Sequence, residues 1–158
     1  MKLLSEAAEY ALRAVVFLAD HPQGWWTVRE ISEGTRSKPG YLVKVLQSLA
    51  RAEIVGVQRG AGGGVSLRAR PEELTILQVL NAVDPLARIK TCPLGLQSHG
   101  SKLCPLHRRI DRAMAMIERE FEGVTIAELL NEKGDSYPLC EEKPRAVTLQ
   151  VKRPRVGA

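Results

Sequence analysis

The sequence predicts a mainly α-helical protein that carries one small β-hairpin. Of the 158 residues 44% are hydrophobic but only 4% are aromatic, so aliphatic side chains must supply most of the core. Apolar residues recur at helical spacing in several segments, whereas an alternation of apolar and polar residues flanks the glycine cluster at 60–64. These observations favour packed helices over a sheet sandwich.

Three helices are expected in the first fifty residues. The first runs from a cap at Ser5 to about Asp20, the second covers Val28–Glu33 and ends at Gly34, and the third begins near Ser37. One face of the third helix is apolar, and another carries basic and hydrogen-bonding side chains. Two short helices joined by a tight turn, the second with a basic outer face, are typical of a helix-turn-helix whose second helix enters the DNA major groove.

A β-hairpin is expected after the third helix. Val55 and Val57 alternate with polar residues before the glycine cluster, and the alternation resumes at Val65. With Arg59 near its tip, this hairpin could contact phosphates as a wing. A nucleotide-binding loop is disfavoured because such loops lead into a helix and commonly carry Gly-Lys-Ser/Thr, whereas Gly64 is followed by Val-Ser-Leu-Arg.

Positive charge is concentrated between residues 25 and 70. This stretch holds eight lysines and arginines against three glutamates, a balance of +5 that equals the net charge of the whole chain. A basic helix face is more often only a solvated surface, but the ordered series of three helices and a hairpin favours a DNA-binding surface. The candidate DNA-contacting residues are Arg29, Ser37, Lys38, Tyr41, Lys44, Ser48, Arg51, Arg59, Gly62 and Gly63.

The second half of the chain combines a short helix, a loop and a long helix. The short helix is expected at Ile76–Val83, and the long helix begins at Pro105, which makes Cys104 its N-cap, and runs to about Phe121. An apolar seam along the long helix requires a partner, and a homodimer would match a palindromic site.

These elements predict a winged helix-turn-helix domain followed by a long dimerisation helix. The expected divisions are a DNA-binding domain at 1–84, a cofactor-binding loop at 85–104, the long helix with a short C-terminal helix at 105–131, and a flexible tail at 132–158. The fold class is therefore mainly α with a small β-hairpin wing.

The expected location is the cytoplasm. The longest apolar run, Ala14–Ala19, is far shorter than the roughly 20 residues of a membrane span, and the N-terminus lacks a cleavable signal pattern. In that reducing compartment, paired cysteines favour metal or redox chemistry over a disulfide framework. We find no nucleophile and base with local support, so we do not expect an enzyme.

Two cysteines and two histidines lie within residues 91–107. Cys104 and His107 are three residues apart on the first turn of a helix, so their side chains share a face and can reach one ion. Cys92 lies twelve residues before Cys104, which is not the C-x₂₋₄-C spacing of structural zinc sites. The chemistry leaves open that both cysteines are small buried hydrophobes and that the histidines are polar surface residues.

The chain resembles the winged-helix regulator family of IscR, which senses iron–sulfur status, and NsrR, which senses nitric oxide. The likeness covers roughly residues 1–130, and its ordered set of motifs is distinctive although each piece is ordinary. It implies a homodimeric transcriptional regulator that binds a palindromic operator in double-stranded DNA. The motifs are EYALRAVVFLA, ISEGTRSKPGYLVKVLQSLARAEIV, RGAGGGVSL, TILQVLNAVD, and Cys92 together with CPLH at Cys104–His107.

The resemblance also implies a cluster between the winged-helix domain and the long helix. In the cluster-bearing members three cysteines come from this loop, and the fourth ligand is a histidine or an acidic residue near the N-terminus. Ser98 stands about where the middle cysteine would be, and His99 beside it is a reserve ligand. An acidic ligand would come from the first helix of the partner subunit. The expected ligands of a [2Fe–2S] cluster are Cys92, Cys104, His107 and Glu9.

Other functions remain compatible with the sequence. One is a regulator of the same architecture that uses thiol oxidation or a mononuclear metal in place of a cluster. Another is a cofactor-free protein-interaction module, which would show no salt-sensitive DNA binding. In the favoured hypothesis the signal is redox state, iron or nitric oxide, and Cys140 in the tail is a bystander thiol.

Overall fold

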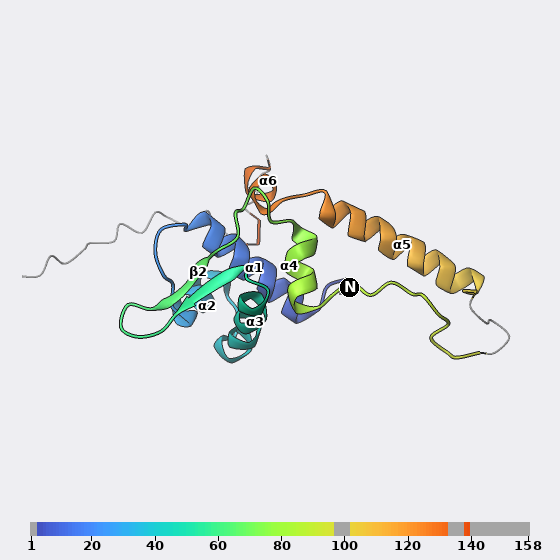
Figure 1. The fold of residues 1–158 in the computed structure, drawn as a ribbon, viewed down its shortest axis with the longest axis horizontal. Helices are drawn as coiled ribbons and strands as arrows, with labels where there is room; N and C mark the ends of the chain where they lie inside the picture. The colour runs from blue at the N-terminus through green and yellow to red at the C-terminus, as the bar shows by residue number, and fades with distance from the viewer. Residues whose placement is uncertain (1–2, 97–101, 133–137, 140–158) are drawn as a thin grey trace, which may run out of the picture.

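The computed structural model describes residues 3–96, 102–132 and 138–139. It confirms the expected fold class, because within these residues a group of packed helices carries one antiparallel hairpin at its edge, in a winged helix-turn-helix arrangement, and a long helix extends away from it (Figure 1). The elements are α1 (Glu6–Asp20), α2 (Val28–Thr35), α3 (Pro39–Arg51), β1 (Val55–Gln58), β2 (Gly64–Leu67), α4 (Ile76–Val83), α5 (Pro105–Glu122) and α6 (Ile126–Asn131).

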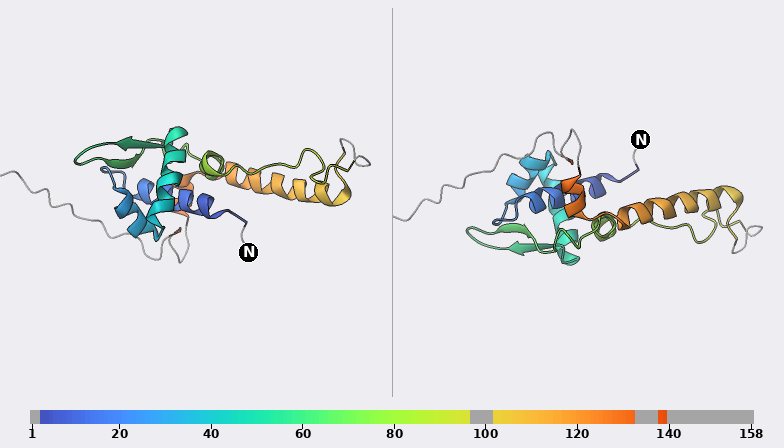
Figure 2. Two further views of the ribbon diagram at one scale, coloured as in Figure 1. Left: turned by 90° about the horizontal axis from the view of Figure 1, so that it is seen from below. Right: turned by 90° about the horizontal axis from the view of Figure 1, so that it is seen from above.

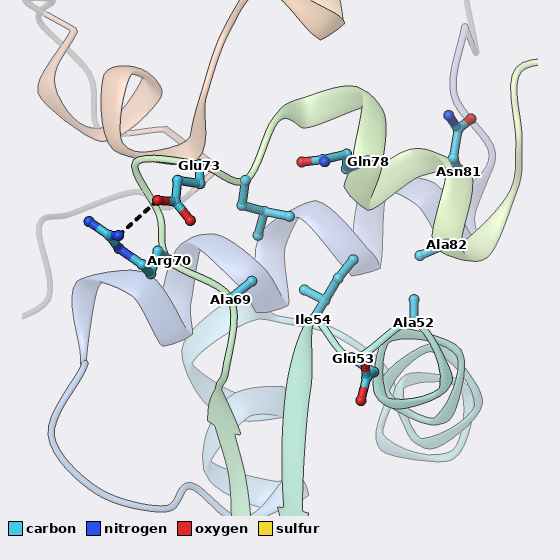
Figure 3. Close-up of a pocket in the computed structure, with 10 residues that line it drawn as sticks. Ala52, Glu53, Ile54, Ala69, Arg70, Glu73, Gln78, Asn81 and Ala82 are labelled. Atoms are coloured by element: carbon cyan, nitrogen blue, oxygen red, sulfur yellow. Dashed lines mark ion pairs between the residues drawn. The ribbon is translucent and has the colours of Figure 1, made fainter.

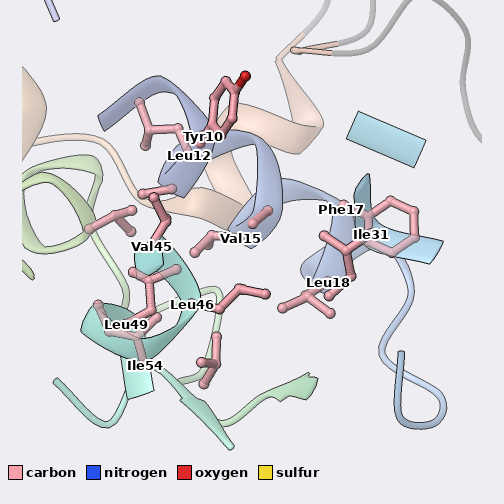
Figure 4. Close-up of a cluster of buried hydrophobic side chains, with 14 of the residues drawn as sticks. Tyr10, Leu12, Val15, Phe17, Leu18, Ile31, Val45, Leu46, Leu49 and Ile54 are labelled. Atoms are coloured by element: carbon pink, nitrogen blue, oxygen red, sulfur yellow. The ribbon is translucent and has the colours of Figure 1, made fainter. Parts of the chain in front are cut away.

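Helix α1 forms the centre of the winged helix-turn-helix domain. It begins where the Ser5 hydroxyl accepts a hydrogen bond from the N–H of Ala8 at 3.2 Å. The helix packs against α2, α3, α4, α6 and β2, and side chains such as Val15 and Leu18 are completely buried among them (Figure 4). Full burial of one such aliphatic side chain contributes about 1.5–3 kcal/mol, so this helix is the main support of the domain.

Helix α2 runs through Gly34 to Thr35, whereas the sequence analysis ended it at Gly34. Gly34 does not end the helix. It leaves room for the Phe17 ring of α1, because a Cβ atom at this position would lie 2.5 Å from Cε2 of Phe17. Arg36 instead ends the helix, with φ of 51° in the left-handed region.

The hairpin is fixed at its base and shaped at its tip. Val55 pairs with Leu67 and Val57 with Val65, and Val65 also exchanges two backbone hydrogen bonds of 2.9 and 2.8 Å with Trp26. Near the tip Gly62 adopts φ of +82°, which disfavours other L-residues. The β-alternation expected from the sequence is therefore present, and the bridge to Trp26 ties the wing to the segment before α2.

Helices α4 and α6 begin side by side. Each starts with a capping box, Thr75 with Gln78 and Thr125 with Glu128, and the two capping threonines form a β-bridge. Hydrogen bonds from the N–H and hydroxyl of Thr125 lower the pKa of Glu128 from its usual 4.5. Ile126 is fully buried in the core. Helix α6 thus packs onto the winged helix-turn-helix domain, although the sequence analysis grouped it with the long helix.

Helix α5 extends away from the rest of the fold, as Figures 1 and 2 show. None of its residues is buried. Its apolar seam divides in two: Phe121 packs against the core, whereas Leu106 and Ile110 are 63% and 40% exposed. Within the described ranges no helix has the length and apolar character that crossing a membrane requires.

Candidate functional site

The outer face of α3 is the first candidate surface. The inner stripe expected from the sequence is buried, with Leu42 and Leu49 at 0% exposure, whereas Tyr41 and Lys44 point away from the core. Because one face of the helix is completely used in packing, the opposite face is held in a fixed orientation.

The beginning of α3 is positioned by α1. The Tyr10 hydroxyl accepts a hydrogen bond of 3.3 Å from the N–H of Lys38 and donates one of 3.3 Å to Glu6. The Tyr10 ring also meets the Tyr41 ring edge to face, with centroids 5.4 Å apart. At the other end of α3 the Arg51 guanidinium donates a 2.8 Å hydrogen bond to the Ser48 hydroxyl. Three of the predicted contact residues, Tyr41, Ser48 and Arg51, are therefore held by neighbours within the chain.

Ser37 does not lie on this surface. Its side chain is buried, its hydroxyl lies 2.9 Å from that of Thr35, and its carbonyl accepts a 2.6 Å hydrogen bond from the Ser32 hydroxyl. Ser37 was one of the candidate DNA contacts expected from the sequence. The structure instead gives it a role in closing the turn between α2 and α3.

The predicted basic residues differ in how they are paired. Arg29 forms a 2.8 Å ion pair with Glu33 on the same exposed face of α2, and hydrogen bonding to that carboxylate raises the pKa of the guanidinium. Lys38, Lys44 and Arg59 make no ion pair with any residue in the described part of the chain. These three side chains are thus available to phosphates without first breaking an internal pair.

The wing glycines shape the backbone. Gly62 needs its positive φ, and a Cβ atom on Gly63 would collide with the carbonyl of Gln58. Gly62 and Gly63 therefore make the tight tip that places Arg59 beside them, and any DNA contact of their own would come from backbone groups.

Sequence reasoning missed part of this surface. A mostly apolar hollow of about 380 Å³ lies between α3 and the wing, and its lining includes Val43, Gln47 and Val57. Val43 and Gln47 are one helical turn apart on the exposed side of α3. Their spacing was visible in the sequence, but neither side chain is basic, so the charge pattern did not single them out.

The second candidate site is at the start of α5. Cys104 is the N-cap residue of this helix, as the sequence predicted, and Pro105 occupies the first turn. The Cys104 Sγ lies 3.3 Å from Nδ1 of His107, so the helix brings a soft sulfur donor and an imidazole into contact. Both side chains are half-buried.

The other predicted ligands are not joined to this pair. Cys92 is a half-buried thiol on the segment after α4, and Glu9 lies on α1, where it pairs with Arg13 at 3.6 Å. Helix α1 belongs to the winged helix-turn-helix domain, and Cys104 lies at the far end of α5 (Figure 1). Among the described residues no group of three histidine, cysteine or acidic side chains converges. Ser98, His99 and Cys140 lie outside the described residues.

A further hollow, of about 540 Å³, lies between the end of α3, the root of the wing and α4 (Figure 3). Buried Ile54 and Leu74 are part of its lining, and Arg70 and Glu73 form a 2.8 Å ion pair at its side. Its lining contains no cysteine or histidine, so it is separate from the site at α5.

A model of the Rrf2 family, described as an iron-dependent transcriptional regulator, matches residues 4–132. The chain belongs to the Rrf2 family. Rrf2 proteins are transcriptional regulators that bind DNA. This disfavours the hypothesis of a module that binds proteins alone.

Solved structures share this Rrf2 fold. CymR (YrzC), the global cysteine regulator of B. subtilis, superposes with a TM-score of 0.68 at 20% identity, over 85% of this chain and 100% of that chain. IscR of T. potens superposes with a TM-score of 0.66 at 20% identity, over 81% of this chain and 85% of the IscR chain. The oxidized form of Staphylococcus aureus CymR superposes with a TM-score of 0.66 at 21% identity, over 85% of this chain and 99% of the CymR chain. At these identities the likeness establishes the fold.

Proposed function

We propose that this Rrf2 protein binds operator DNA as a homodimer, with an affinity set by a [2Fe–2S] cluster. The proposed ligands are Cys92, Cys104 and His107 of one subunit and Glu9 of the other. The observation that carries the proposal is the 3.3 Å contact between Cys104 and His107 at the start of the exposed helix α5. A thiol and an imidazole in contact on one helix face form half of a mixed sulfur and nitrogen ligand set.

The donor set suits such a group. Two thiolates and one imidazole can ligate a [2Fe–2S] centre in which one iron carries nitrogen, and a carboxylate can complete the set. When bound, the cluster would supply reversible one-electron chemistry. Because Glu9 lies on α1, away from the start of α5 in the same chain, a second copy is the source that we propose for this ligand.

The proposed regulation works through the position of the two reading helices. Residues on α5 that bind a shared centre would fix how one subunit sits against the other, and hence the spacing of the two α3 helices. A coupling free energy of about 1–3 kcal/mol would change operator affinity about 5- to 150-fold. Lys38, Lys44 and Arg59 would supply the phosphate contacts, since no carboxylate among the described residues forms an ion pair with them.

A second candidate function uses the same thiols without a cluster. The fold is shared with a CymR protein that was solved in an oxidized form, and Cys92 and Cys104 are both half-buried thiols here. In this alternative, oxidation of the thiols or binding of a single metal ion would alter the loop and α5.

Anaerobic purification with quantification of iron and sulfide, together with a visible absorption spectrum, tests the proposal. We expect about two irons and two sulfides per subunit, with charge-transfer bands, in the unmodified protein. Cys104→Ala should lose the bands, whereas Cys140→Ala is the matched control and should keep them. A Cys104→Ala protein that retained the cluster would refute the ligand assignment. Absence of bands from the unmodified protein, combined with oxidant-sensitive DNA binding, would favour the thiol alternative.

A further inference from the structure

An ion-pair network joins the segment after α4 to the side of α5. The Arg88 guanidinium binds the Asp111 carboxylate through two hydrogen bonds of 2.7 Å and reaches Glu118 at 3.1 Å. The backbone N–H of Ile89 donates a further 3.0 Å hydrogen bond to Asp111. A planar guanidinium that engages one carboxylate with two donors fixes orientation as well as distance.

The three charged side chains are more than a loose surface pair. Their exposed fractions are 36% for Arg88, 19% for Asp111 and 26% for Glu118, so water screens them less than the exposed Arg70–Glu73 pair at 71% and 65%. Hydrogen bonds from Arg88 lower the pKa of Asp111 below its usual 3.8, which keeps the carboxylate charged throughout the physiological range.

The network sets where Cys92 can lie. Residues 85–92, which we call the arm, run beside α5 in the direction opposite to the helix (Figure 2). Cys92 is four positions after Arg88, so the chain between them spans at most about 14 Å. Asp111 is seven positions after Cys104, a rise of about 10 Å along α5. With Arg88 bound to Asp111, the arm is therefore long enough for Cys92 to reach the level of Cys104.

The chain also turns at this level. The Gly95 N–H donates a 3.0 Å hydrogen bond to the Cys92 carbonyl, and Gly95 has a φ of +62°. A turn closed by these residues ends the outward course of the arm where the N-terminus of α5 lies. Both thiols are half-buried there.

We infer that Arg88 is a positioning residue, which binds Asp111 and Glu118 and so keeps the arm, and Cys92 with it, at the end of α5 that carries the Cys104–His107 pair. The inference rests on the proposed function for its purpose, since it explains how ligands twelve residues apart form one site in a single chain. The contacts of Arg88 do not depend on whether the cysteines bind a metal centre or react with an oxidant.

The test measures how readily one reagent joins the two thiols in the reduced, chelator-treated full chain. A Cys140→Ser background leaves Cys92 and Cys104 as its two cysteines. Dibromobimane becomes strongly fluorescent after two thiolates have each displaced one bromide, and denaturing electrophoresis separates bridging within a chain from bridging between chains. We expect Arg88→Ala to slow bridging within the chain at least ten-fold.

Matched variants separate positioning from folding. Asp111→Ala should slow bridging similarly, and the double variant should be no slower than either single one, because all three remove the same contact. Arg88→Lys keeps the charge without the two-pronged geometry and should give an intermediate rate. Arg70→Ala removes an exposed pair far from the thiols and should leave the rate unchanged. Thermal unfolding of each variant identifies any loss of fold, in which case Arg88→Lys carries the comparison.

A folded Arg88→Ala or Arg88→Lys protein that bridged within two-fold of the parent rate would overturn the inference. Additive slowing in the double variant would do the same. Neither result depends on iron, because bridging is measured on metal-free protein. A failure of the cluster proposal would appear instead in the iron and sulfide content of the unmodified protein, so the two failures are distinguishable.

Discussion

At the scale of single residues, three glycines of this chain answer different demands. Gly62 supplies a positive φ at the wing tip, Gly34 leaves room for the Phe17 ring, and Gly40 in the first turn of α3 has no atom within 4 Å of where its Cβ would be. Residue type alone does not distinguish these cases. The environment of each glycine therefore decides what a substitution does.

Gly34→Ala should destabilise the protein by about 1–3 kcal/mol. The added methyl group would lie 2.5 Å from the Phe17 ring, and the ring is buried against Ile31 and Trp26 neighbours that restrict its movement. Urea denaturation followed by circular dichroism measures the change. Gly40→Ala is the control and should be neutral or stabilising by up to about 1 kcal/mol, because it adds a helix-favouring residue in open space. Equal destabilisation by both would contradict the steric explanation.

At the scale of elements, the buried faces of α3 and the wing orient the surface that we propose reads DNA. Leu42 and Leu49 fix the rotation of α3, Tyr10 fixes its start, and the bridge from Trp26 to Val65 fixes the wing. The exposed charges make use of an orientation that apolar packing has already set.

Lys44→Ala should weaken DNA binding and reduce its salt dependence. The Lys44 side chain is exposed on α3 and pairs with no carboxylate in the described part of the chain, so on binding it would displace about one counterion from a phosphate. Fluorescence anisotropy with genomic or selected DNA over a salt series should show the slope of log affinity against log salt falling by about one. Arg119→Ala, which removes a positive charge from α5, should leave the slope unchanged.

Much of the element structure could be predicted from local sequence, because caps act over three or four residues. Ser5, Thr75 and Pro105 fixed helix starts in this way. Contacts between distant segments have no such signature. The bridge between Thr75 and Thr125, which docks α6, and the pairing of Arg88 with Asp111 across 23 residues follow from the tertiary fold.

The candidate site was predictable to the same limit. The i, i+3 spacing placed Cys104 against His107 because a helix fixes such pairs. The burial of Ser37 was not predictable, since a serine before a helix suits either solvent or an internal hydrogen bond. The position of Cys92 depends on the course of the arm, which no local periodicity encodes.

At the scale of the whole molecule, the chain has a packed winged helix-turn-helix domain and one projecting helix. The C-terminal half of the α5 seam is covered by its own domain through Phe121. The N-terminal half exposes Leu106 and Ile110, and Leu94 on the neighbouring loop is 72% exposed. Exposed apolar side chains on the half of α5 that carries the Cys104–His107 pair suit a second copy, which would also bring its Glu9.

Ile110→Glu should therefore shift the protein from dimer to monomer. The carboxylate would be placed in the apolar half of the seam, and its desolvation would oppose association by several kcal/mol. Sedimentation velocity over a protein concentration series measures the shift, and circular dichroism checks that α5 persists. Arg109→Glu places the same side chain at the adjacent exposed position outside the seam and should remain dimeric. If Ile110→Glu dimerised with unchanged affinity, the contact between subunits would lie elsewhere on the molecule. The proposal that the partner subunit supplies Glu9 as the fourth ligand would then lose its support.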